Sequence, residues 1–184
     1  MGKRSPGTFA RRPHDSYQTP YEAVLPLLPH LAGVTTYAEP CCGEGLLISH
    51  LVRHRLTCTY AGDIQTGDDA LFWFPRAHEI IPDIICTNPP WTRQLLHPLI
   101  NHFMRQCPTW LLFDADWAHT LQAAPYLPHC AKIVAVGRVK WIAQSAFESK
   151  DNAAWYLFDR RHTAGASFFG LDPSFEIEKQ EVAA

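Results

Sequence analysis

The chain has 184 residues, of which 47% are hydrophobic and 18% are charged, and its formal net charge is −2. This composition is typical of a globular protein and excludes a disordered one, and the length suits one domain with a full core. No apolar run approaches the roughly 20 residues that span a bilayer, and the basic N-terminus lacks the apolar segment of a secretory signal. We therefore expect a cytoplasmic protein with no membrane partner.

The chain is expected to divide into an arm, a domain and a tail. Residues 1–16 contain Gly, Pro, Arg and Ser without periodicity, which predicts a flexible N-terminal arm. Residues 17–170 carry every strong secondary-structure pattern and predict a single domain without internal repeats. Residues 171–184 are polar and acidic and predict a loosely held tail.

Helical and strand-like segments alternate along this domain. A short or kinked helix is expected over 19–31, because Thr19 is a plausible N-cap, Pro20 suits the first helical position and two more prolines follow. Strands are predicted over 34–40, 57–64, 80–88, 109–116, 132–142 and 153–161, and helices over 43–54, 92–106 and 117–127. The apolar segment 69–75 is too short to assign. The alternation predicts βαβ units and a mainly parallel sheet with helices on both faces.

The cysteines and histidines do not predict a metal site. None of the six cysteines forms a C-x-x-C pair, and several lie in apolar runs, so we expect reduced core thiols. The ten histidines are scattered. Basic residues gather in short groups that can follow phosphates, although such groups are more often solvated surface.

A glycine turn follows the first predicted strand. In "YAEPCCGEGLLISHL", Glu39 ends the strand, and Gly43 and Gly45 stand where the next helix begins. Glycines there let the backbone approach a ligand, and a helix N-terminus offers free N–H groups. A dinucleotide site requires a third glycine where Ile48 stands, which disfavours an NAD enzyme.

Two further polar positions fall at the same edge of the predicted sheet. Asp63 follows the second strand, where an acidic side chain can accept both hydroxyls of a ribose, although Asp is also common in turns. The third strand ends at Asn88, Pro89, Pro90 and Trp91. Open α/β folds bind ligands at this edge.

The segment "NPPW" predicts a pocket for a flat amine. Pro89 and Pro90 fix φ and remove two N–H donors, so nearby carbonyls stay available as acceptors. Asn88 adds an amide oxygen, and two converging acceptors suit an –NH₂ group. Trp91 offers a face on which a base can stack, worth roughly 1–3 kcal/mol.

These motifs together resemble the S-adenosylmethionine-dependent amino methyltransferases, and among them the DNA adenine-N6 methyltransferases. The resemblance rests on "YQTPYEAV", "EPCCGEG", Asp63 and "NPPW", has the gamma-like motif order, and runs from about Tyr17 to about Asp159. It implies an α/β fold, a Rossmann-like class I methyltransferase three-layer sandwich. In that fold the sheet is mostly parallel, with an antiparallel strand near the C-terminus.

The resemblance also implies roles for individual residues. Asn88, Pro89, Pro90 and Trp91 would be catalytic and bind the target amine. The cofactor S-adenosyl-L-methionine would contact Tyr17, Thr19, Pro20, Glu39, Cys41, Gly43, Asp63, Ile64, Asp69 and Asn88. Within that set, Asp63 would hold the ribose and Ile64 would lie beside the adenine. Asp69 would accept from the adenine amino group, with Asp68 an equally near candidate.

The sequence departs from the family pattern in three ways. Trp91 stands where Tyr or Phe is more frequent, and Cys41, Cys42 and Glu44 replace apolar and small residues. A separate target-recognition domain is missing, so either loops read a short site or a protein partner supplies recognition. The expected acceptor is the N6 amino group of adenine in DNA. RNA adenine, a protein glutamine amide and a non-catalytic subunit of the same fold remain alternatives.

Three residues of later strands are set aside. Asp114, Asp116 and Trp155 can border the substrate cleft, but strand-end acids and a core aromatic residue are the more common explanation.

Overall fold

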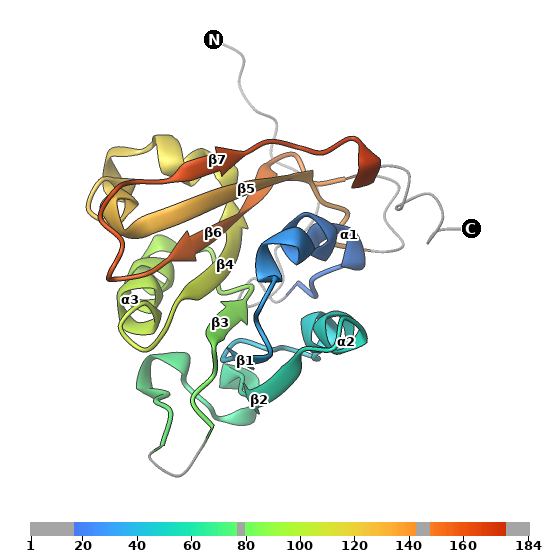
Figure 1. Cartoon of the computed structure of the whole chain (residues 1–184), viewed down its shortest axis with the longest axis vertical. Coiled ribbons are helices and arrows are strands. Elements are labelled where there is room, and N and C mark those ends of the chain that lie inside the picture. The colour runs from blue at the N-terminus through green and yellow to red at the C-terminus, as the bar shows by residue number, and fades with distance from the viewer. Residues whose placement is uncertain (1–16, 77–79, 143–147, 176–184) are drawn as a thin grey trace.

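The computed structural model describes residues 17–76, 80–142 and 148–175, and within them the chain forms one seven-stranded sheet (Figure 1). The strands are β1 (Thr36–Glu39), β2 (Thr57–Ala61), β3 (Ile84–Thr87), β4 (Thr109–Asp114), β5 (Cys130–Arg138), β6 (Asn152–Phe158) and β7 (Ser167–Phe169). Their order across the sheet is β2-β1-β3-β4-β6-β5-β7.

One strand runs against the others. β6 pairs antiparallel with both β4 and β5, whereas the remaining pairs are parallel. The predicted mostly parallel sheet with an antiparallel strand near the C-terminus is therefore confirmed. β7 was not predicted, because its three exposed residues are too few to form a pattern.

Short helices cover the sheet. The α-helices are α1 (Tyr21–Val24), α2 (Leu46–Arg53) and α3 (Arg93–Phe103). The 3₁₀ helices are η2 (Leu25–Leu31), η3 (Ile64–Thr66), η4 (Ala70–Phe72), η5 (Ala115–His119), η6 (Leu121–Ala123) and η7 (Leu127–His129). No helix in these described parts of the chain is both long and apolar enough to cross a bilayer.

Two sequence-based expectations for the helices were wrong. Thr19 is not an N-cap, since Pro20 occupies that position and no side chain caps α1, which becomes the 3₁₀ helix η2 at Leu25. The segment 117–127 forms 3₁₀ turns rather than an α-helix, because Thr120 adopts an extended conformation and Pro125 lacks an N–H donor.

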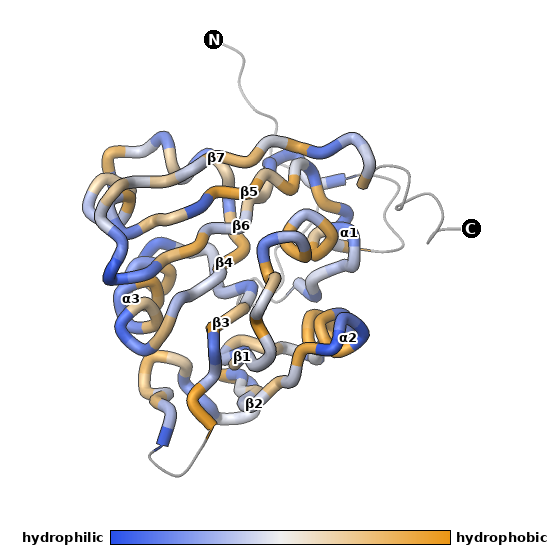
Figure 2. Tube along the Cα trace, in the orientation of Figure 1, coloured by the Kyte–Doolittle hydropathy of each residue, from blue (hydrophilic) through white to orange (hydrophobic). Residues whose placement is uncertain are grey.

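The core has one apolar cluster on each face of the sheet. Alternate strand residues face opposite sides, so Tyr37 and Trp110 pack with α1 and α2, whereas Ile85 and Leu111 pack with α3. In Figure 2, the apolar residues of α2 lie on the side that faces the rest of the chain, and its polar residues lie on the outer side. This is the expected three-layer arrangement.

The two ends of the chain lie mostly outside the described residues. The predicted arm over 1–16 lies outside the described residues, as does the tail beyond residue 175. Residues 171–174 are exposed, and Phe175 is half-buried.

Candidate functional site

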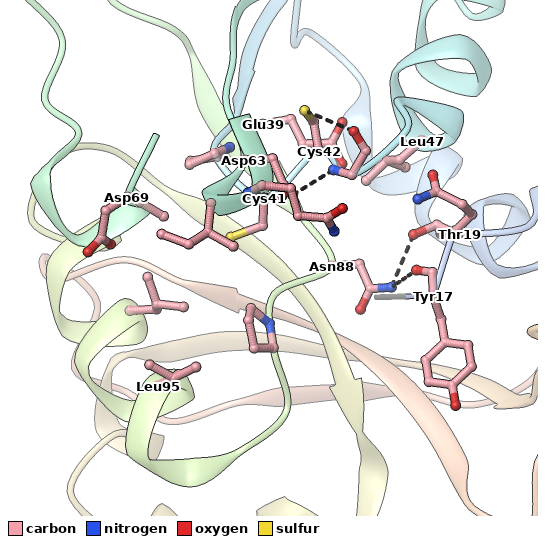
Figure 3. Close-up of a pocket in the computed structure, with 18 of the residues that line it drawn as sticks. Tyr17, Thr19, Glu39, Cys41, Cys42, Leu47, Asp63, Asp69, Asn88 and Leu95 are labelled. Carbon is pink, nitrogen blue, oxygen red and sulfur yellow. Dashed lines mark hydrogen bonds between the residues drawn. The ribbon is translucent and has the colours of Figure 1, made fainter. Parts of the chain in front are cut away.

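The carboxyl ends of β1, β2 and β3 surround a cavity of ≈ 190 Å³ (Figure 3). The parallel pairing of these strands places their following loops side by side. Of the predicted cofactor residues, those that line the cavity are Tyr17, Thr19, Glu39, Cys41, Gly43, Asp63, Ile64, Asp69 and Asn88. Pro20 is the N-cap of α1 and is not among the lining residues.

The loops after β1 and β2 are tied to each other by hydrogen bonds. The Cys42 amide donates to the Gly62 carbonyl at 2.9 Å, and the Gly62 amide donates to the Glu39 carbonyl at 3.1 Å. The Gly43 amide donates to Asp63 Oδ2 at 2.8 Å. Gly43 has a φ of +52°, which only glycine adopts readily, and this conformation turns its N–H toward the carboxylate.

Asp63 therefore has a structural role in these turns, which the sequence analysis named as the alternative to ribose binding. Its second oxygen accepts from the Gln65 amide at 2.9 Å and caps η3. A carboxylate has about four acceptor positions, so two remain for a ligand. The predicted contact with a ribose stays a prediction.

Glu39 is the most unusual polar group of the cavity. Its side chain is 2% exposed, and its Oε2 atom has no hydrogen-bond partner among the described residues. Burial raises the pKa of Glu39 well above its usual range, and the nearby charge of Asp63 raises it further. A buried carboxyl group without a partner is costly, which points to a missing ligand that donates a hydrogen bond or carries positive charge.

The structure separates the two candidate aspartates after β2. Asp69 lines the cavity, and its Oδ1 accepts from the Leu71 amide at 2.9 Å. Asp68 instead accepts from the Thr66 hydroxyl at 3.0 Å and is not among the lining residues. The geometry thus favours Asp69 as the residue that faces a ligand.

The side-chain amide of Asn88 has a fixed orientation at the end of β3. Its Nδ2 donates to the Tyr17 carbonyl at 3.3 Å and to the Thr19 hydroxyl at 3.2 Å (Figure 3). Its Oδ1 accepts from the Trp91 indole N–H at 3.0 Å. Thr19 is 3% exposed, so the predicted helix cap is in fact a buried partner of Asn88.

Asn88 also lines a second cavity, of ≈ 310 Å³. Among the described residues, Tyr17 and Asn88 are the only ones that line both cavities. The two cavities therefore meet at the residue that sequence reasoning placed at the centre of the chemistry.

Two tryptophans and two aspartates line the second cavity. Trp91 and Trp141 meet edge to face, with ring centroids 5.6 Å apart and planes at 84°. Asp114 and Asp151 also line this cavity. Burial raises the pKa of Asp114, and the charges of Asp116 and Asp151 raise it further.

Sequence reasoning identified only part of this second cavity. It predicted Trp91 but set Asp114 aside, although Asp114 ends β4 at the same sheet edge as Glu39. Trp141 and Asp151 were missed because they follow β5 and precede β6, where no local motif marks them. Trp155, also set aside, is fully buried in the core.

The prolines of the motif occupy different places. Pro89 is buried, and Pro90 lines the first cavity. No backbone hydrogen bond to the Pro89 carbonyl occurs within residues 17–76, 80–142 and 148–175. Pro89 is not among the residues that line either cavity, so the expected contact of its carbonyl with a target amine stays a prediction.

The sequence matches no protein-family model, and no curated protein matches it either. Solved structures are similar in fold. A protein from Listeria monocytogenes, described as a class I S-adenosylmethionine-dependent methyltransferase, aligns with a TM-score of 0.58 and 13% identity over 89% of this chain and 70% of that one.

Two further solved structures align less well. An RNA methyltransferase from Pyrococcus horikoshii has a TM-score of 0.49 and 15% identity over 79% of this chain and 86% of its own. A TehB-like S-adenosylmethionine-dependent methyltransferase from Corynebacterium glutamicum has a TM-score of 0.45 and 14% identity over 76% of this chain and 86% of its own. The alignment with the Listeria protein shows that the chain has the class I methyltransferase fold.

Proposed function

We propose that this protein is an S-adenosylmethionine-dependent methyltransferase and that its acceptor is the N6 amino group of adenine in DNA. The observation that carries the proposal is the meeting of two cavities at Asn88, whose amide oxygen has a fixed direction. One cavity suits the methyl donor and the other suits a flat acceptor.

The first cavity fits S-adenosylmethionine. The unpaired Glu39 Oε2 suits the ammonium group of the methionine part. Asp63 and Asp69 offer acceptors for ribose hydroxyls and an adenine amino group, and Ile64 and Leu71 offer apolar surface for the ring. When bound there, S-adenosylmethionine supplies an electrophilic methyl group on a sulfonium.

Asn88 and Pro89 prepare the acceptor nitrogen. The lone pair of an aromatic amine is delocalised into its ring, which makes the nitrogen a poor nucleophile. Asn88 Oδ1 and the Pro89 carbonyl accept its two hydrogens, favour a tetrahedral nitrogen and stabilise the positive charge that develops on it. Their rigid placement aligns the lone pair toward the first cavity, and alignment of this kind supplies much of the rate.

The second cavity suits a base more than an unmodified peptide. Trp91 and Trp141 provide aromatic walls, and stacking on such walls is worth roughly 1–3 kcal/mol per base. This offsets part of the few kcal/mol needed to flip a base out of a duplex.

Basic residues adjoin the second cavity in the sequence and favour a substrate with phosphates. Arg93, Lys140 and Lys150 directly follow or precede residues that line it. The described residues are otherwise taken up by the sheet and its covering helices, so we propose that nearby loops or a protein partner provide target recognition.

Transfer of a tritiated methyl group tests the proposal. Purified protein and labelled S-adenosylmethionine are incubated with unmethylated genomic DNA, total RNA and a pool of glutamine-containing peptides. We expect label in DNA, located on adenine by modified-base sequencing. Label only in RNA or peptide would move the acceptor, and binding without transfer to any pool would indicate a non-catalytic subunit.

A further inference from the structure

The orientation of the Asn88 side-chain amide is fixed by two partners, one of which can only donate a hydrogen bond and one of which can only accept one. The Trp91 indole N–H can only donate, and the Tyr17 carbonyl can only accept. The oxygen of the amide must therefore point toward Trp91 and the nitrogen toward Tyr17. A reversed amide would place two donors against each other and two acceptors against each other.

The hydrogen bonds also limit what Asn88 can offer a substrate. Both hydrogens of Nδ2 are used, by the Tyr17 carbonyl and the Thr19 hydroxyl. An amide oxygen has two lone pairs, and Trp91 occupies one of them. Asn88 can thus present one acceptor and no donor.

Trp91 is itself held in place. Pro89 and Pro90 fix the backbone between the two partners, and the indole packs against Trp141 at 5.6 Å and against both apolar clusters. The ring is only half-buried, so its remaining surface faces the second cavity. A phenylalanine or tyrosine here would keep an aromatic wall but remove the N–H donor from this position.

We propose that Trp91 is a positioning residue whose indole N–H locks the Asn88 carboxamide so that its remaining lone pair faces the acceptor amine. This inference rests on the function proposed above and adds a second role to the aromatic wall. Loss of the N–H should slow transfer even when substrate is saturating. Loss of aromatic surface should mainly weaken substrate binding.

The hydrogen bond can be tested without any activity. In protein labelled with ¹⁵N-tryptophan, the indole signal that disappears in Trp91→Phe belongs to Trp91. We expect Asn88→Ala to shift that signal and to speed its exchange with solvent by roughly tenfold, as for loss of one hydrogen bond. Unchanged exchange would overturn the inference.

Kinetics test the consequence for catalysis. Trp91→Phe and Trp91→Tyr should both lower kcat by roughly tenfold, the effect of one lost hydrogen bond, with S-adenosylmethionine affinity unchanged within about threefold on the same grounds. The two variants should differ in KM for the acceptor, because their rings differ. A fall confined to KM would overturn the inference and leave Trp91 as a stacking surface.

Trp73→Phe is the matched control. Trp73 is more deeply buried than Trp91, its Nε1 has no hydrogen-bond partner among the described residues, and it lines neither cavity. Its replacement should leave kcat unchanged, and an equal loss in both variants would overturn the inference. If the wild type transfers no methyl group to any acceptor, the proposed function fails and the catalytic role of Trp91 falls with it. An active wild type with an unaffected Trp91→Phe variant overturns the positioning role alone.

Discussion

Replacement of Glu39 by glutamine should stabilise the unliganded protein and weaken its ligand. The glutamate is 2% exposed and has an unpaired oxygen next to Asp63. Glutamine leaves a polar atom unpaired at the same place but carries no charge, so the gain comes from the buried charge alone. Keeping this carboxyl group ionised in the folded state costs about 1.4 kcal/mol for every tenfold increase in its proton affinity on folding. Since 1 kcal/mol corresponds to roughly 2–4 °C for a chain of this size, we expect the melting midpoint of Glu39→Gln to rise by at least about 3 °C at neutral pH.

The pH dependence has a definite sign. The raised pKa of Glu39 means that the folded state holds this proton at pH values where the unfolded chain, with a pKa of about 4.3, has lost it. Stability of the wild type therefore falls as pH rises from about 4.3 through the folded pKa. The difference in stability between Glu39→Gln and the wild type should shrink as the pH is lowered toward the unfolded pKa of about 4.3.

Ligand should narrow the difference in stability between the two proteins. A ligand at 100 times its dissociation constant adds about 2.7 kcal/mol to stability, and a tenfold weaker ligand adds about 1.4 kcal/mol less. In thermal melts with S-adenosylmethionine, the wild type should gain more than the variant. Glu44→Gln, in the same loop but exposed, should match the wild type. A lower unliganded midpoint for Glu39→Gln, or an equal ligand shift in both proteins, would refute the reasoning.

Three other changes have measurable outcomes. Asn88→Ala should lower transfer by roughly 10²–10³, as for loss of a preorganised electrostatic contact. Because the same change removes the hydrogen bonds from Asn88 to the Tyr17 carbonyl and the Thr19 hydroxyl, it should weaken S-adenosylmethionine binding by less than about tenfold. Calorimetry showing lost binding would contradict the role. Asp83 accepts three hydrogen bonds from Thr35 and Thr36, and these bonds lower its pKa to about 2. Its ionised form should therefore stabilise the folded protein above its unfolded pKa of about 3.9, and this stabilisation should be lost as the pH falls through about 2. Asp83→Asn should therefore be less stable than the wild type in urea at neutral pH, with the gap closing in acid; a pH-independent gap would contradict this. The reaction should stop at one methyl group, because a methylated amine has one hydrogen left for two acceptors, and mass spectrometry finding dimethylated base would contradict that count.

The sheet was predictable because its pattern is local. Apolar β-branched runs with helical segments between them indicate a parallel sheet whatever the side chains later contact. The three residues of β7 carry no such pattern, and their strand exists only because β5 offers an edge to pair with. The segment 117–127 has helical spacing, but Thr120 adopts an extended conformation and Pro125 lacks an N–H donor.

Much of the first cavity was also predictable, because Glu39, Asp63 and Asn88 stand at the ends of three consecutive strands that meet at one edge. The second cavity was not. Trp141 and Asp151 come from segments that only the antiparallel pairing of β5 and β6 brings to Asn88. The role of Thr19 could not be predicted either. Its hydroxyl suits a helix cap, but it instead accepts a hydrogen bond from Asn88, which is distant in the sequence.

The loop after β1 and the loop after β2 are joined by three hydrogen bonds. Two amide–carbonyl bonds and one amide–carboxylate bond join them, so neither loop can shift alone without breaking such a bond. A ligand that binds between them meets loops that are already ordered, so less conformational entropy is lost on binding. Substitutions at Gly62 should consequently alter the contacts that both loops make with a bound ligand, although Gly62 lines neither cavity.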